Sequence, residues 1–302
     1  MKILFAADGS MYSEMAVNML QALELRPQTE ITVTTVVPEH TFLGGLTLQR
    51  LRGKAVKEQI RKAHEEGALQ MLHGFVETLR EIGLEVETVV AWGSPAEQIL
   101  ELARDTRADL IVIGAKGLDN SPRFPLGSVA QKVMKYADTS VLLAREKRKG
   151  IRRVLLATDG SKHSDAAARF LLDLPLPKKS KVFLVTSLES HVAALLKMPT
   201  LDLETNWKIL LELQAAEEQA AKKLTAKTEG LFRGKNYYTE TMVLRGEPAH
   251  EILMAAKTLN PDLVVVGAKG LTGIETFLLG SVAQRVARFS RYSVLIVRAR
   301  KR

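Results

Sequence analysis

The feature that most constrains the fold is an internal repeat that spans nearly the whole chain. The stretch KILFAADGS (2–10) matches RVLLATDGS (153–161) at an offset of 151 residues. The stretch ADLIVIGAKG (108–117) matches PDLVVVGAKG (261–270) at an offset of 153 and is identical at seven of ten positions. Solenoid repeats recur every 20–50 residues or so, whereas a period near 150 residues indicates two copies of one globular domain.

The positive charge of the chain lies at equivalent ends of the two repeats. Residues 145–153 carry a net charge of +5 and residues 298–302 carry +4, which together equal the net charge of +9. Neither segment has the aromatic or amphipathic character of a nucleic-acid stacking platform or a membrane-surface helix. We therefore favour a solvated linker and tail over a nucleic-acid-binding surface. The predicted organisation is domain 1 at 1–145, a basic linker at 146–152, domain 2 at 153–298 and a basic tail at 299–302.

The composition is that of a globular protein. Hydrophobic residues make up 46% of the chain, charged residues 25%, and cysteine is absent, which excludes a disulfide framework and a thiol nucleophile. No apolar run approaches the roughly 18 residues that a membrane span needs. The short N-terminal run ILFAA is interrupted by Asp8 and does not resemble a signal peptide. These features predict a cytoplasmic protein without a membrane span.

Short apolar runs alternate with amphipathic segments in both halves. This alternation predicts an α/β fold, in which helices cover both faces of a parallel five-stranded sheet. Both common doubly wound strand orders, 3-2-1-4-5 and 2-1-3-4-5, are compatible with the pattern. The expected strands are 2–7, 30–37, 85–91, 109–113 and 140–144, then 153–158, 181–186, 237–244, 262–266 and 293–297. The expected helices are 12–25, 48–82, 95–106 and 128–137, then 164–172, 202–228, 249–259 and 281–289.

A glycine-rich spacing occurs once in each half. Each copy reads Gly-Ala-Lys-Gly, nine residues, then Gly-Ser, and lies between a buried strand and a helix start. Backbone amides and the helix dipole favour an anion at such a place. Lys116 and Lys269 lie inside these loops and can neutralise phosphate, and Ser128 and Ser281 are expected to cap the following helices. The structural alternative is a tight strand-to-helix turn with an ordinary serine cap.

An aspartate ends the first strand of each copy. In parallel sheets, ligands bind beyond the carboxyl ends of the strands where the winding reverses. For the order 3-2-1-4-5, Asp8 would face Gly114 and Asp159 would face Gly267. A carboxylate there can accept hydrogen bonds from a ribose or a base, or help to hold the hydration shell of magnesium.

Several enzyme signatures are absent. The chain has no P-loop, no dinucleotide fingerprint and no G-x-S-x-G elbow, and its six histidines lack metal-ligand spacing. His163 is interpreted as a solvated residue of the first helical turn. We predict no catalytic residue and no metal site in the protein. A slow ATPase or nucleotide-transferring enzyme, and an adaptor that binds anions or nucleic acid through the basic linker and tail, are the alternatives to a nucleotide-binding regulator.

The strand-one aspartate followed by G-x-x-G, nine residues and G-S resembles the nucleotide-binding signature of the universal stress protein family. The resemblance covers residues 1–298 and identifies a tandem member. It implies the strand order 3-2-1-4-5 and a stress-response regulator that binds ATP, or alternatively AMP or ADP, with Mg²⁺ held mainly by the phosphates. The implied first site comprises Asp8, Val36, Gly114, Lys116, Gly117, Gly127, Ser128 and Val129. The implied second site comprises Asp159, Ser187, Gly267, Lys269, Gly270, Gly280, Ser281 and Val282.

Two departures from the family pattern distinguish the copies. The first loop contains Pro122 and Pro125, which lack backbone N–H donors, so we expect the second loop to form the stronger ATP site. Ser187 replaces an aliphatic residue and would alter adenine packing. The resemblance further implies that the last strands of the two domains pair with each other and form an internal pseudo-dimer. Such pairing would cover two exposed strand edges, which otherwise invite aggregation. A homodimer and an unidentified protein partner are also expected.

Overall fold

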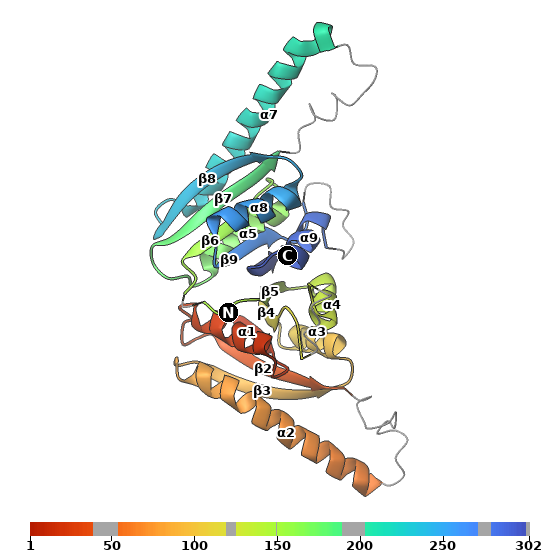
Figure 1. Ribbon diagram of the computed structural model, residues 1–302. Helices are drawn as coiled ribbons and strands as arrows, with labels where there is room; N and C mark the ends of the chain where they lie inside the picture. The colour runs from red at the N-terminus through yellow and green to blue at the C-terminus, as the bar shows by residue number, and fades with distance from the viewer. Residues whose placement is uncertain (39–53, 119–124, 149, 189–202, 271–278, 300–302) are drawn as a thin grey trace. The chain divides into compact units, whose positions relative to one another are not determined.

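The structure is a computed structural model that describes residues 1–38, 54–118, 125–148, 150–188, 203–270 and 279–299. It contains two compact units, the first covering Met1–Ile151 and the second beginning at Arg152. Each unit repeats the same order of strands and helices (Figure 1). The elements of the first unit are β1 (Lys2–Ala6), α1 (Met11–Gln21), β2 (Glu30–Val37), α2 (Lys54–Arg80), β3 (Glu85–Trp92), α3 (Pro95–Asp105), β4 (Leu110–Gly114), α4 (Ser128–Tyr136) and β5 (Ser140–Ala144). Those of the second are β6 (Arg153–Ala157), α5 (Lys162–Asp173), β7 (Ser180–Leu188), α7 (Leu203–Phe232), β8 (Tyr237–Arg245), α8 (Pro248–Leu259), β9 (Leu263–Gly267), α9 (Ser281–Phe289) and β10 (Ser293–Val297).

Both units contain a five-stranded parallel sheet. The order is β3-β2-β1-β4-β5 in the first unit and β8-β7-β6-β9-β10 in the second, which is 3-2-1-4-5 in each. The winding reverses where β1 pairs with β4, in the register Ile3–Leu110, and where β6 pairs with β9, in the register Val154–Leu263. The predicted fold class is confirmed, and the structure selects one of the two strand orders that the sequence pattern allowed.

The strands of the first unit differ in burial. Strands β4 and β5, and β10 of the second unit, are buried at every residue, as is typical of parallel strands that helices cover on both faces. Strand β3 is mostly half-buried. Helices α1 and α2 pack against each other, and α3 packs against α4, so the two pairs form the two outer layers (Figure 1). The same pairing joins α5 with α7 and α8 with α9.

A tight turn joins the first strand of each unit to the following helix. Gly9 has φ +77° and Gly160 has φ +80°, a backbone conformation that glycine adopts without steric cost. Ser10 and Ser161 then cap α1 and α5, because their hydroxyls accept hydrogen bonds from the amides of Ser13 and Ser164. These turns hold the preceding aspartates at the carboxyl edge of each sheet.

The basic linker contacts the domains more closely than the solvated segment that we expected. The ammonium of Lys147 lies 2.8 Å from a carboxylate oxygen of Glu14, and the amide of Arg148 donates to the side chain of Asn18. The amides of Arg152 and Arg153 both donate to one carboxylate oxygen of Asp262, at 2.9 Å. The linker is therefore held to the units that it joins by one ion pair and by several of its backbone amides.

In the part of the chain that the structure describes, no helix combines the length and the apolar character that crossing a membrane requires.

Candidate functional site

A cavity of about 630 Å³ lies in the first unit, at the carboxyl ends of β1, β2 and β4. Its volume is within the range of roughly 300–1,000 Å³ that is usual for small-molecule sites. It lies where the sheet winding reverses, as expected for a doubly wound fold. All eight residues that the sequence indicated for the first site line it: Asp8, Val36, Gly114, Lys116, Gly117, Gly127, Ser128 and Val129.

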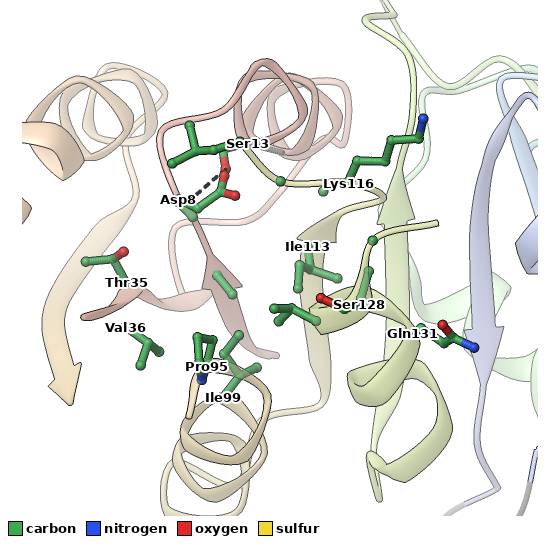
Figure 2. A pocket seen from close by; sticks show the side chains of 18 of the residues that line it. Asp8, Ser13, Thr35, Val36, Pro95, Ile99, Ile113, Lys116, Ser128 and Gln131 are labelled. Atoms are coloured by element: carbon green, nitrogen blue, oxygen red, sulfur yellow. Dashed lines mark hydrogen bonds between the residues drawn. The ribbon is translucent and has the colours of Figure 1, made fainter. Parts of the chain in front are cut away.

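The carboxylate of Asp8 is held by its own turn. Its Oδ1 accepts a hydrogen bond from the Ser13 hydroxyl at 2.7 Å (Figure 2) and another from the Ser10 amide at 3.0 Å. The Asp8 amide in turn donates to the Ser13 hydroxyl oxygen at 3.0 Å. These bonds fix one carboxylate oxygen and leave Oδ2 turned toward the glycine loop, where a methyl group placed on Gly117 would lie 2.5 Å from it.

The glycines of the loop are required by close approach of neighbouring atoms. A Cβ atom on Gly114 would lie 2.6 Å from the Cβ of Tyr12 and 2.9 Å from its carbonyl carbon. A Cβ atom on Gly127 would lie 3.1 Å from the Cα of Lys116, within the loop itself. The loop, the start of α1 and the aspartate are thus packed together without space for side chains.

Helix α4 begins at the cavity without a side-chain cap. Gly127 is its N-cap residue, with extended backbone angles, and Ser128 is the first helical residue. The prediction that Ser128 and Ser281 cap their helices is therefore wrong, because the glycine before each serine occupies the capping position. The Gly127 amide donates to the carbonyl of Ala115 at 2.8 Å, so this amide is already bonded within the loop. The first-turn amides of α4 have no acceptor within the helix, and residues 128–130 line the cavity.

The remaining walls combine an apolar side with polar edges. Val36, Pro95 and Ile99 lie on the side of the cavity opposite Lys116 (Figure 2). The side chain of Lys116 extends away from Asp8 and from these apolar residues (Figure 2). The cavity therefore has an apolar wall on one side, while the uncapped start of α4 provides its anion-favouring part.

Several lining residues were missed by reasoning from the sequence. Most of them recur in the second repeat, and this recurrence was the available signal: Ser13 with Ser164, Thr35 with Thr186, Pro95 with Pro248, Ile99 with Ile252, and Gln131 with Gln284. They escaped notice because helix-start prolines, helical isoleucines and strand threonines also occur for purely structural reasons.

The end of the first glycine loop is tied to the last strand. A guanidinium nitrogen of Arg145 donates to the carbonyl of Pro125 at 3.0 Å. Burial lowers the pKa of Arg145, and the nearby Tyr12 hydroxyl acts in the opposite direction. Pro125 lacks an N–H group but supplies an acceptor, so this proline helps to anchor the loop. Pro122 lies outside the described residues.

The second unit places its predicted residues at equivalent positions. Asp159 follows β6, Ser187 lies in β7, Gly267 ends β9, and Gly280 is the N-cap of α9. Lys269 and Gly270 follow β9, and Ser281 and Val282 are the first residues of α9. A methyl group on Gly270 would lie 2.8 Å from a carboxylate oxygen of Asp159, so aspartate and glycine loop meet here too. Residues 271–278 of this loop lie outside the described residues.

The end of the second strand is more polar in the second unit, where Ser187 occupies the position of Val36 in the first. The Ser187 hydroxyl donates to the carbonyl of Gly246 at 3.0 Å, a contact that the equivalent Val36 cannot make. The neighbouring Thr186 is 3% exposed, and its hydroxyl has no hydrogen-bond partner among the described residues. This end of β7 is therefore more polar than the corresponding end of β2.

Together, the doubly wound sheet, the cavity at the winding reversal and the uncapped helix start are typical of the class of α/β proteins whose ligand sites lie at the carboxyl edge of the sheet. The family model described as the universal stress protein family matches residues 1–145 and again 150–298. The chain belongs to the universal stress protein family, with two such domains in tandem.

Individual relatives agree with this assignment. A universal stress protein of Methanocaldococcus jannaschii is 32% identical over 151 residues, which are 50% of this chain and 84% of the relative. A putative universal stress protein of Staphylococcus aureus (strain USA300) is 30% identical over 145 residues, 47% of this chain and 82% of the relative. A solved universal stress protein of Archaeoglobus fulgidus shares the fold with a TM-score of 0.62 at 19% identity, covering 98% of this chain and 96% of that one.

Proposed function

We propose that this protein is a regulator that binds ATP at the carboxyl edge of each sheet and responds to the nucleotide by a change of conformation. The observation that carries the proposal is the first-unit cavity, where all eight predicted site residues meet around an uncapped helix start. The family assignment supports it, since the sequence signature that led to the cavity is the one that resembles the nucleotide-binding pattern of that family.

The donor set suits a phosphate group. The first-turn amides of α4 point from a helix N-terminus, where the helix dipole and the amides together favour an anion. No side chain of the described chain caps this helix, in contrast to α1, whose first turn is capped by Ser10. Gly117 and Gly127 keep the loop free of side chains that would fill the space. These residues would hold the phosphates.

The other parts of the nucleotide fit the opposite walls. The free oxygen of the Asp8 carboxylate would accept a hydrogen bond from a ribose hydroxyl, while its partner oxygen is held by Ser10 and Ser13. The apolar wall formed by Val36, Pro95 and Ile99 would take the base. Among the described residues, no group of three histidine, aspartate or glutamate side chains could hold a metal ion, so Mg²⁺ would be bound mainly through the phosphates.

The regulatory output would come from the loops that the nucleotide touches. A ligand shifts a conformational equilibrium only through contacts that differ between the two states. Contacts to the glycine loop and to the first turn of α4 would order one arrangement of the loop and so present an altered surface to a protein partner.

Calorimetric titration of the full chain with Mg-ATP tests this function. We expect saturable binding that Gly127→Val weakens at the first site and Gly280→Val weakens at the second, since each added side chain fills its loop. Gly74→Ala is the matched control, because no atom lies within 4 Å of the added methyl. Failure of every adenine nucleotide to bind would contradict the proposal. Steady ATP turnover in the same preparations, lost in the double variant Asp8→Ala/Asp159→Ala, would favour the enzyme alternative.

A further inference from the structure

The basic linker begins beside the cavity of the first unit. Arg145, which directly precedes the linker, donates a hydrogen bond from its guanidinium group to the carbonyl of Pro125 at 3.0 Å. Pro125 is followed by Leu126 and Gly127, which both line the cavity. Arg145 therefore ties the start of the linker to the end of the glycine loop.

The next linker residues are held by helix α1. The ammonium of Lys147 lies 2.8 Å from a carboxylate oxygen of Glu14, and the amide of Arg148 donates to the side-chain oxygen of Asn18. Glu14 directly follows the serine whose hydroxyl holds the carboxylate of Asp8. The linker is thus attached both to the glycine loop and to the helix that helps to hold the aspartate.

The second unit uses the equivalent acidic residue differently. Asp165 of α5 corresponds to Glu14, and Lys227 of α7 corresponds to Gly74 of α2. The ammonium of Lys227 lies 3.1 Å from the carboxylate of Asp165, so this carboxylate is paired between the two helices. Gly74 has no side chain that could pair in this way, and a groove of about 310 Å³ lies there between α1 and α2, lined also by Lys147. Glycine at position 74 therefore leaves Glu14 to the linker.

The attachment of the linker to α1 is weak enough to be adjusted. The side chains of Lys147 and Glu14 are 61% and 54% exposed, and exposed ion pairs contribute little because water and salt screen them. A segment held by such contacts opens locally at a low cost in free energy, so a change at one contact alters how long the segment stays attached. The bond from Arg145 to the loop is the contact that a ligand in the cavity would affect first.

We propose that nucleotide binding at the first site tightens the attachment of the linker to the first unit, through Arg145 and helix α1. The inference rests on the proposed function, in which the nucleotide orders the glycine loop. An ordered loop holds the carbonyl of Pro125 in one position, which fixes Arg145 and favours the contacts of the following residues with Glu14 and Asn18. By linkage, a linker held on α1 strengthens nucleotide binding at the first site by the same factor.

Hydrogen exchange of the linker amides in the full chain, with and without saturating Mg-ATP, tests the inference. Because the amide of Arg148 donates to Asn18, ATP should slow its exchange about two- to fivefold, the range that a weak exposed contact allows. The amides of Arg152 and Arg153, which donate to Asp262 of the second unit, are the internal control and should not respond.

Loop variants identify the site that acts on the linker. Gly127→Val fills the first loop and should abolish the protection of Arg148, whereas Gly280→Val fills the second loop and should retain it. ATP binding that leaves the exchange of Arg148 unchanged, or protection that persists in Gly127→Val, would overturn the inference while leaving the proposed function intact. Failure of every adenine nucleotide to bind would overturn both.

Substitution of Gly74 provides a matched pair of variants outside the first cavity. Gly74→Lys copies the second unit and should draw Glu14 away from Lys147, which reduces the ATP-dependent protection of Arg148. Gly74→Gln, which is long but uncharged, is the control. An added Cβ atom at this position meets no atom within 4 Å, so the pair decides the inference even if Gly127→Val disturbs folding of its loop. Equal protection in Gly74→Lys and Gly74→Gln would overturn the role of the Glu14 contact and the inference with it.

Discussion

The same aspartate is held differently in the two units. In the first, the Ser13 hydroxyl donates to the Asp8 carboxylate at 2.7 Å. In the second, the equivalent Ser164 donates to the carbonyl of Ser161 at 3.0 Å and accepts a bond from Thr158 at 3.4 Å. Thr158 stands where the first unit has Ala7. The equivalent serine hydroxyl therefore donates to a carboxylate in the first unit and to a backbone carbonyl in the second.

This difference shows that duplication preserved the frame of the site and changed its polar contacts. The close packing at the strand-end glycines, the helix start and the sheet order are retained in both units, whereas the distance from the second loop glycine to the aspartate differs. The first-turn residues and the ends of the second strands have diverged. Substitutions in the features that both units retain should therefore have equal effects on the two units. Substitutions in the features that have diverged should have unequal effects.

The largest effect is expected at the strand-end glycines, where both units should respond alike. Gly114→Ala and Gly267→Ala bring a methyl group within 2.9 Å of backbone atoms of Tyr12 and His163, which cannot move without shifting a helix. We expect each to lower the local free energy of unfolding by about 2 kcal/mol or more, the usual cost of overpacking. Hydrogen exchange of β4 and β9 in the full chain measures each unit separately.

The controls are helical glycines of the same units. An added methyl meets no atom within 4 Å at Gly74 in α2 or at Gly230 in α7. Because alanine is the better helix former, these substitutions should leave stability unchanged or raise it by up to about 1 kcal/mol. If the strand-end substitutions proved as mild as these, the close approach would not be what requires glycine there.

A smaller and unequal effect is expected at the second glycine of each loop. Gly117→Ala places a methyl 2.5 Å from Asp8 Oδ2, whereas Gly270→Ala leaves 2.8 Å to Asp159 Oδ2. We expect ATP affinity to fall about tenfold at the first site and less at the second. Calorimetry would measure both. In an Asp8→Ala background, Gly117→Ala should cost little further affinity; additive losses would show that the methyl acts without the carboxylate.

The serine pair should separate the two aspartate environments. Ser13→Ala removes a bond to a carboxylate, for which about 1.5–3 kcal/mol is usual, and Ser164→Ala removes a neutral bond to a carbonyl, for which about 0.5–1.5 kcal/mol is usual. We expect the first substitution to lower the stability of its unit more, as measured by hydrogen exchange of β1 and β6. Equal losses would mean that the difference in bonding has no energetic consequence.

Much of the fold was predictable because short sequence patterns mark its strands and helices, and because each pattern occurs in both repeats. Buried strands read as apolar runs, and proline marks the starts of α3 and α8. The choice of strand order was not available from these patterns, since it depends on which strand each crossover reaches. Helix boundaries were less accurate: α5 begins at Lys162, ahead of the expected Ser164, because the Ser161 cap fixes its first turn.

The proximity of Asp8 and Gly114 was predictable once the order 3-2-1-4-5 was taken from the family resemblance. Asp8 follows β1 and Gly114 ends β4, and these two strands are neighbours in that order. The capping role of Ser128 was wrong because the glycine before it takes the capping angles. The bond from Ser13 and the lining by Ile99 depend on side-chain directions that the sequence pattern does not specify.

The smallest expected effect concerns acid sensitivity, which only the second unit should show at its first turn. The folded pKa of His163 is lowered, so below about pH 6.5 the unfolded chain binds more protons at this residue than the folded chain does. Stability should therefore fall as the pH decreases from 7 toward 5. His163→Tyr, which copies the first unit, should reduce this loss in β6 and β9, as read by hydrogen exchange at pH 5.5 and 7.5 after correction for intrinsic rates. Because the ring is only partly buried, solvent screening keeps the change small. An unchanged difference between the two pH values would show that neither burial nor the surrounding cations Lys162, Lys269 and Arg298 disfavour protonation of the folded His163.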